Sequence, residues 1–340
     1  MRGLVILLGI TGCGRWGVDP GAQGVGADDG VDATVSAIHP DLCEVADVGD
    51  LNLSGVPVSM RAVALSDGFA VLIGTDVGHV YAIRVASDRT LAGQHLPISG
   101  SAYVLHGVGQ IADRPFLYLD VFNDSYLKGL DPTWDGYGTA STGTAASIDP
   151  PFALLPDGLT AMSGTITSGT LELREIDTTG ATITTPSVQP TAIAASFTPI
   201  PGKIRAAIGR DDGTCETFVI DANTIRDPKT IPSCANPIVT GRSNGHGAVV
   251  HTTANQLAVY LIGLDTTLTI GAAADPRIVT IDDEIWLAYQ RAGGVALGRV
   301  VDAALEEAPV PVAKSPFDLT PTAMFWLDGM RLRTATPCLR

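Results

Sequence analysis

Short apolar runs separated by tight turns make up most of the chain. In residues 60–88, apolar runs at 61–65, 69–74 and 80–85 are separated by Asp67-Gly68 and by Asp76-Val77-Gly78. Asp-Gly between apolar runs favours a β-hairpin, because a type I′ turn needs residues that tolerate a positive φ. The pattern therefore predicts three consecutive antiparallel strands in this stretch.

The same pattern recurs to the end of the chain. Two apolar runs joined by a turn containing Gly or Asp occur at 64–75, 153–165, 198–210, 279–291 and 324–336, with weaker copies at 104–120 and 240–253. A third run ends in an aspartate, 37 to 46 residues after the previous one, at Asp88, Asp131, Asp177, Asp221, Asp265 and Asp302. Because a short fourth run follows each aspartate, the repeating unit is four strands.

This period and composition resemble those of a β-propeller, in which each blade is a four-stranded antiparallel sheet. Six units fit between about residues 58 and 315, and residues 316–340 hold the first two strands of a seventh. The runs 41–47 and 51–53 can supply its third and fourth strands, which would close the ring and remove free sheet edges. We therefore predict an all-β, seven-bladed propeller over residues 39–340, with six or eight blades as alternatives.

The N-terminus has the form of an export signal. Met1-Arg2-Gly3 is followed by an apolar run at 4–10 that is far too short to span a bilayer. Ile10-Thr11-Gly12-Cys13 resembles the lipobox of bacterial lipoproteins. The resemblance implies a signal peptide at 1–12, a lipid such as palmitate on Cys13, and anchoring to the bacterial cell envelope, for which we favour the outer membrane. The alternative is an apolar N-terminal strand with a chance cysteine.

Residues 13–38 are expected to be a flexible tether between the lipid and the folded domain. Gly, Ala and Asp dominate this segment. Such a composition buries too little apolar surface to offset the entropy of ordering the chain.

Four cysteines remain besides Cys13, and an even number in an exported chain predicts two disulfides. The strand alignment places Cys215 at the start of the third strand of the fourth unit and Cys234 at the end of its fourth strand. It places Cys43 in the third strand of the shared blade and Cys338 just after its second. We therefore predict the pairs Cys215–Cys234 and Cys43–Cys338. No C-x-x-C motif is present, so a cysteine metal site is not expected, and we expect no cofactor.

The net charge of −15 argues against two classes of partner. An acidic surface repels nucleic-acid phosphates, and it also repels anionic lipid headgroups. We therefore expect no nucleic-acid binding, and contact with a membrane through the N-terminal lipid alone.

Three features could carry chemistry. Residues 117–138 concentrate aromatic and acidic side chains, and Trp134, Asp135 and Tyr137 lie in a Gly/Pro-rich loop where they could bind a sugar or a peptide at the surface.

The phased aspartates could include a catalytic carboxylate pair, but Asp also favours turns. Residues 241–245 match G-x-S-x-G, but a nucleophile elbow needs a following helix, and the sequence predicts a turn instead.

These observations favour a lipid-anchored binding or scaffolding protein of the cell envelope without catalytic activity. Its partner would be an envelope protein or a glycan, and we expect a monomer. The alternative is a propeller-type glycan hydrolase or lyase, because acids from several blades can converge in such a fold.

Overall fold

The structure is a computed structural model. It describes residues 39–340 except 100–102, 122–123, 145–146, 149–151, 156–158, 180–181, 185–189, 222–223, 255 and 312–315. The expected signal peptide, the tether and Cys13 lie outside the described residues. Within the described part of the chain, no helix is long and apolar enough to cross a membrane.

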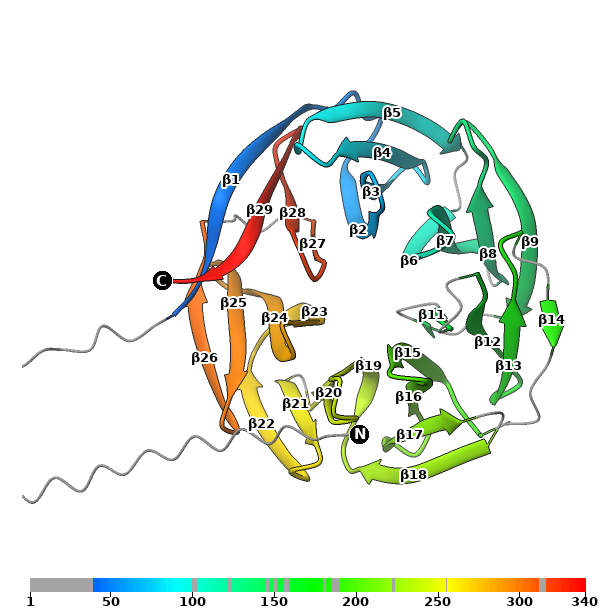
Figure 1. Cartoon of the computed structure of the whole chain (residues 1–340), viewed down its shortest axis with the longest axis vertical. Helices are drawn as coiled ribbons and strands as arrows, with labels where there is room; N and C mark the ends of the chain where they lie inside the picture. The colour runs from blue at the N-terminus through cyan, green and yellow to red at the C-terminus, as the bar shows by residue number, and fades with distance from the viewer. Residues whose placement is uncertain are drawn as a thin grey trace, which may run out of the picture. The chain divides into compact units, whose positions relative to one another are not determined.

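The described residues form seven antiparallel blades arranged in a ring, so the fold is a seven-bladed β-propeller (Figure 1). Blade 1 contains β2 (Pro57–Leu65), β3 (Gly68–Thr75), β4 (Val80–Ala86) and β5 (Leu91–Ile98). Blade 2 contains β6 (Tyr103–Ile111), β7 (Arg114–Val121), β8 (Asp124–Leu130) and β9 (Tyr137–Thr144). Blade 3 contains β11 (Phe152–Leu154), β12 (Ala161–Thr167), β13 (Thr170–Ile176) and β14 (Thr182–Thr184).

Blades 4 to 6 follow the same plan, with the first strand innermost. Blade 4 contains β15 (Ala194–Ile200), β16 (Lys203–Gly209), β17 (Cys215–Asp221) and β18 (Thr224–Ile231), and the short β10 (Ser147–Ile148) joins β15 in parallel. Blade 5 contains β19 (Ala235–Gly241), β20 (Gly247–Thr253), β21 (Gln256–Ile262) and β22 (Thr266–Gly271). Blade 6 contains β23 (Ala274–Ile281), β24 (Glu284–Arg291), β25 (Gly294–Val301) and β26 (Ala304–Pro309). The six complete units predicted from the repeat are therefore confirmed.

The turn between β23 and β24 has the type I′ geometry, whereas at Asp67-Gly68 only Gly68, the first residue of β3, has a positive φ, so the type I′ turn predicted there was wrong. Between β23 and β24, Ile281 pairs with Glu284, and the two turn residues Asp282 and Asp283 have φ of 48° and 65°. Two positive φ values define a type I′ turn, whose twist matches that of the flanking strands. Asp tolerates this conformation better than most residues, so the turn stabilises the hairpin without requiring glycine.

Both chain ends contribute to blade 7, but in a different division from the predicted one. The sheet order is β27 (Phe317–Leu319), β28 (Met324–Asp328), β29 (Arg331–Leu339) and β1 (Pro40–Asp50). The C-terminal segment thus supplies three strands, and β1 supplies the fourth, outermost strand. Residues 51–53 form no strand. The predicted assignment of 41–47 and 51–53 to the third and fourth strands was therefore wrong.

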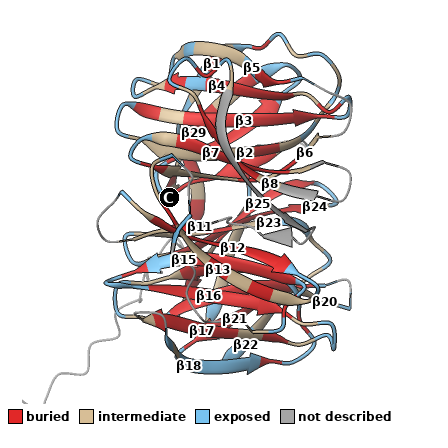
Figure 2. Cartoon of the chain, turned by 90° about the vertical axis from the view of Figure 1, so that its right-hand side faces the viewer, coloured by how far each residue is buried: buried red, intermediate tan, exposed pale blue. Residues whose placement is uncertain are grey.

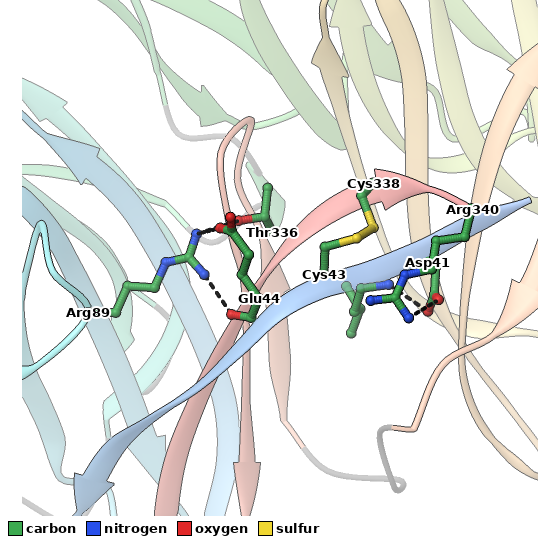
Figure 3. Close-up of a disulfide and its surroundings, with 8 residues drawn as sticks. Asp41, Cys43, Glu44, Arg89, Thr336, Cys338 and Arg340 are labelled. Carbon is green, nitrogen blue, oxygen red and sulfur yellow. Dashed lines mark hydrogen bonds and ion pairs between the residues drawn. A yellow bond between two sulfur atoms is a disulfide. The ribbon is translucent and has the colours of Figure 1, made fainter.

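Two disulfides confirm the predicted pairing. Cys43 of β1 is bonded to Cys338 of β29 across 295 residues of sequence, and Cys215 is bonded to Cys234 across 19. Figure 3 shows the first bond between the two antiparallel strands, next to the ion pair of Arg340 with Asp41. The first disulfide therefore links the two strands that close the ring.

The core lies between adjacent blades, where the buried residues of the inner strands gather (Figure 2). Trp286 of β24 and Trp326 of β28 are each 4% exposed and belong to one cluster between blades 6 and 7. Phe69 and Phe325 pack edge to face across the seam between blades 1 and 7, with ring centroids 5.0 Å apart. Burial of this apolar surface is the main stabilising term of the ring.

Candidate functional site

The innermost strands of blades 5 and 6 begin with matching bulges. The sequences are Ala-Asn-Pro-Ile at 235–238 and Ala-Asp-Pro-Arg at 274–277, and the strand register shifts within each. Asn236 and Asp275 occupy the same position in the two blades, and both have φ of 49°. Such bulges leave one residue unpaired and redirect its side chain. Both residues are exposed.

These bulges line a cavity at the centre of the ring, at the end where the inner strands begin. The cavity has a volume of about 710 Å³, and Arg61 of β2 lies on it together with Asn236, Thr252, Asp275 and Arg277. We call it the mouth cavity. A second cavity of about 280 Å³ shares Arg61, Asp275 and Arg277 with it and extends toward blade 7. The volume of the mouth cavity, about 710 Å³, falls within the usual range of about 300–1,000 Å³ for small-molecule sites.

Asp318 of β27 ties three blades together beside this cavity. Its Oδ1 lies 2.8 Å from Nε of Arg277 in blade 6, and its Oδ2 accepts a 2.5 Å hydrogen bond from the backbone N–H of Ala62 in blade 1. The side chains of Asp318 and Arg277 are 8% and 15% exposed. In blade 1, Arg61 donates from Nε to the carbonyl oxygen of His106 in blade 2, at 2.6 Å. Polar contacts thus run from blade 6 through blades 7 and 1 to blade 2, across the seam where the chain ends meet.

Three of the six phased aspartates have structural roles in turns. Asp88, Asp131 and Asp177 each accept hydrogen bonds from the backbone N–H and the hydroxyl of the threonine two residues later, and Asp212 does the same. The hydrogen bond from the threonine hydroxyl is the main reason why the pKa of each of Asp88, Asp131 and Asp212 lies below the usual range of an aspartate. These groups are stabilised as carboxylates, which does not suit a general acid.

The G-x-S-x-G match at 241–245 is a hairpin turn between β19 and β20. The N–H of Arg242 donates to the carbonyl of His246 at 2.8 Å, and the N–H of Gly245 donates to the carbonyl of Arg242 at 3.1 Å. A strand follows rather than a helix, so the stretch does not form a nucleophile elbow. The interpretation of this motif as a turn is confirmed.

Trp134 lies in the interior rather than on the surface. It is 7% exposed, has φ of 66° and belongs to the cluster between blades 1 and 2 that includes Leu117 and Leu130. The backbone N–H of Trp134 donates a hydrogen bond to the carbonyl of Asp131, and this turn directs the indole toward the interior. Asp135 remains at the surface, 72% exposed, with Oδ1 3.0 Å from Nδ1 of His95. The expected surface position of Trp134 was therefore wrong.

The side chain of Tyr137 lies outside the described residues, so a ligand site at Trp134, Asp135 and Tyr137 stays a prediction. Among the side chains that the structure describes, no group of three His, Cys, Asp or Glu residues is placed to hold a metal ion.

Sequence reasoning did not find the mouth cavity. Arg61 and Asp275 are more than 200 residues apart in the chain, and nothing local indicates that they share a cavity. One signal was available: Asn-Pro and Asp-Pro recur at the start of two consecutive inner strands. Proline is confined to edges, first residues and bulges of sheets, so the repeated pair marks a bulged strand start.

Comparison with known proteins shows the fold alone. No protein-family model matches the sequence, and no curated protein matches it. Hydrazine synthase from Kuenenia stuttgartiensis is similar in structure, with a TM-score of 0.58 and 13% identity, over 84% of this chain and 97% of that one. A chain of the mitotic checkpoint complex is also similar, with a TM-score of 0.57 and 11% identity, over 96% of this chain and 98% of that one. Because these two proteins differ in function, the likeness assigns none to this chain.

Proposed function

We propose that this chain is a lipid-anchored binding or scaffolding protein of the bacterial cell envelope, and that it holds its ligand at the mouth cavity without chemical turnover. The observation that carries the proposal is the state of the buried carboxylate beside the cavity, that of Asp318. Asp318 is buried, paired with Arg277 and bonded to the backbone of blade 1, so its charge serves to hold blades together.

The turn aspartates support the same proposal. A glycan hydrolase needs two carboxyl groups about 5–10 Å apart across a cleft, one of them with a raised pKa. Asp88, Asp131 and Asp212 instead have a lowered pKa and are fixed by their own turns. The remaining lining of the mouth cavity is dominated by Ala, Pro, Ile, Asn and Thr, which suits recognition rather than acid–base chemistry.

The disulfides support export, since such bonds persist in oxidising compartments. The lipobox-like sequence ending at Cys13 supports attachment by a lipid. Cells expressing the full chain should incorporate labelled palmitate, and Cys13→Ser should abolish incorporation. Labelling of the mutant at the level of the unmodified chain would remove the anchor from the proposal.

The experiment that tests binding against catalysis is a panel of chromogenic glycosides and polymeric glycans, assayed for product with the purified, disulfide-bonded domain. We expect no turnover. Release of product that a single Asp→Asn substitution abolishes would establish the hydrolase or lyase alternative and overturn the proposal.

A further inference from the structure

The loop between β1 and β2 contains the acceptor sequence of N-glycosylation, N-x-S/T with x other than Pro. Its residues are Asn52, Leu53 and Ser54. A glycan is added at such a sequence only in an exported chain and only where the asparagine reaches solvent. Asn52 and Ser54 are both exposed, and neither belongs to a strand. A second match, at residues 123–125, begins outside the described part of the chain, so nothing is inferred from it.

The backbone of Asn52 is fixed while its side chain stays available. Its N–H donates to Oε1 of Gln94 at 3.0 Å, and its carbonyl oxygen accepts from Nε2 of the same side chain at 2.5 Å. The N–H of Ser54 donates to the hydroxyl of Tyr81 at 2.8 Å. The Asn52 side chain has no hydrogen-bonding partner among the described residues. A substituent on its amide nitrogen would therefore break no contact of the folded ring.

The contacts that fix this loop come from residues later in the chain. Besides Gln94 and Tyr81, Met330 takes part, since its carbonyl oxygen accepts from the N–H of Leu51 at 2.8 Å. A transferase must surround the asparagine, and these contacts hold the backbone against blades 1 and 7. In a chain exported from its N-terminus, the loop emerges before all three partners. We therefore expect a glycan to be attached before the ring closes.

We propose that Asn52 is N-glycosylated during export. The donor is an oligosaccharide carried on a lipid diphosphate, and the enzyme is an oligosaccharyltransferase. The amide nitrogen of Asn52 forms a bond to the anomeric carbon of the first sugar. The bond from that carbon to the diphosphate oxygen breaks, the diphosphate leaves with the electron pair, and the amide gives up one proton. The inference depends on export, which the disulfides support, and not on the ligand or the lipid anchor.

The glycan would lie at the end of the ring that holds the mouth cavity. Residues 51–56 lead from β1 to Pro57, the first residue of β2, and the cavity lies where the inner strands begin. Val56 and Val58 follow on the same stretch and are 61% and 59% exposed. A bulky, hydrated glycan nearby would make this part of the surface more soluble.

The test is a peptide map of the full chain purified from the cells that make it naturally. Mass spectrometry with fragmentation locates any added mass. We expect an oligosaccharide on Asn52. Asn236 is the matched control in the same digest, because it is exposed but followed by Pro237 and Ile238, and it should be unmodified.

Three variants test the acceptor sequence. Asn52→Gln should abolish the added mass, and it should fold, because Gln94 contacts only the backbone of residue 52. Ser54→Ala should abolish the added mass although Asn52 is present, whereas Ser54→Thr, which keeps a hydroxyl, should retain it.

The timing is tested with the chain made in cells that lack such a transferase. With transferase and lipid-linked donor added in vitro, the reduced and unfolded chain should be modified at Asn52, and the folded chain should not. Equal modification of the two would show that the folded loop is accessible and would refute attachment before ring closure.

An unmodified Asn52 in the naturally made chain would overturn the inference and leave the proposed function in place. Added mass that survives Asn52→Gln would assign the glycan to another residue and would also overturn it. Glycoside turnover, or palmitate labelling that survives Cys13→Ser, would instead count against the proposed function, whatever is found at Asn52.

Discussion

Removing the charge of Asp318 should destabilise the ring far more than removing any surface charge. Asp318 is 8% exposed and its partner Arg277 is 15% exposed, with 2.8 Å between Oδ1 and Nε. Asp318→Asn preserves the shape of the side chain but replaces a carboxylate with a neutral amide. Taking away one partner of a buried ion pair leaves the other charge without its compensation and costs about 3–5 kcal/mol. We expect a loss in that range in the free energy of unfolding.

The assay is urea unfolding monitored by tryptophan fluorescence, with the disulfides intact. The dependence of the unfolding free energy on urea concentration is compared between variants. Asp67→Asn is the matched control, since Asp67 and its partner Arg84 are 55% and 46% exposed. Exposed pairs are worth about 0–1 kcal/mol, so the control should shift the midpoint little.

A double variant separates the buried charge from the loss of packing. Arg277→Met with Asp318→Leu removes both charges, and such replacements of a buried pair are often neutral or stabilising. The double variant should therefore lose less stability than Asp318→Asn alone. If Asp318→Asn costs no more than Asp67→Asn, Asp318 does not tie blades 6, 7 and 1 together.

Two further predictions concern stability. Burial is the main cause that lowers the pKa of His251 from its ordinary value of 6.5, so the unfolded chain binds a proton more readily than the folded one. Stability should therefore fall as the pH drops below about 6.5. His251→Leu should flatten the pH dependence of the urea midpoint between pH 7 and 5. The same dependence of the midpoint on pH in the variant and the unmodified chain would contradict this. Replacing Cys43 and Cys338 with Ser should cost about 5–6 kcal/mol by the loop-entropy estimate for 295 residues, whereas the same change at Cys215 and Cys234, 19 apart, should cost about 3. Equal losses for the two pairs would show that loop length does not set the effect.

Much of the fold could be predicted because the turns are local. Asp282 and Asp283 define a hairpin from two residues, and each blade repeats such a signal at a nearly constant period. Blade 7 was misdivided because β27 (Phe317–Leu319) has three residues, with prolines at 316 and 321. A run of that length shows no alternation of polar and apolar residues, so it reads as a loop.

The site was harder to predict because it depends on tertiary packing. The Gly/Pro-rich composition around Trp134 indicates a surface loop, but the indole packs between blades 1 and 2, and packing overrides composition. Arg61 and Asp275 reach one cavity only because the ring closes. Nothing in the segments around these residues contains that information.

The claim on which the site depends is that the two chain ends pair in one blade. Peptide mapping by mass spectrometry under non-reducing conditions tests it most directly. We predict a disulfide-linked pair that joins a peptide from 40–50 to one from 331–340, through Cys43 and Cys338, and its loss on reduction. Linkage of Cys43 to Cys215 or Cys234 instead, or two free thiols at Cys43 and Cys338 in the exported protein, would contradict the ring closure and remove the mouth cavity with it.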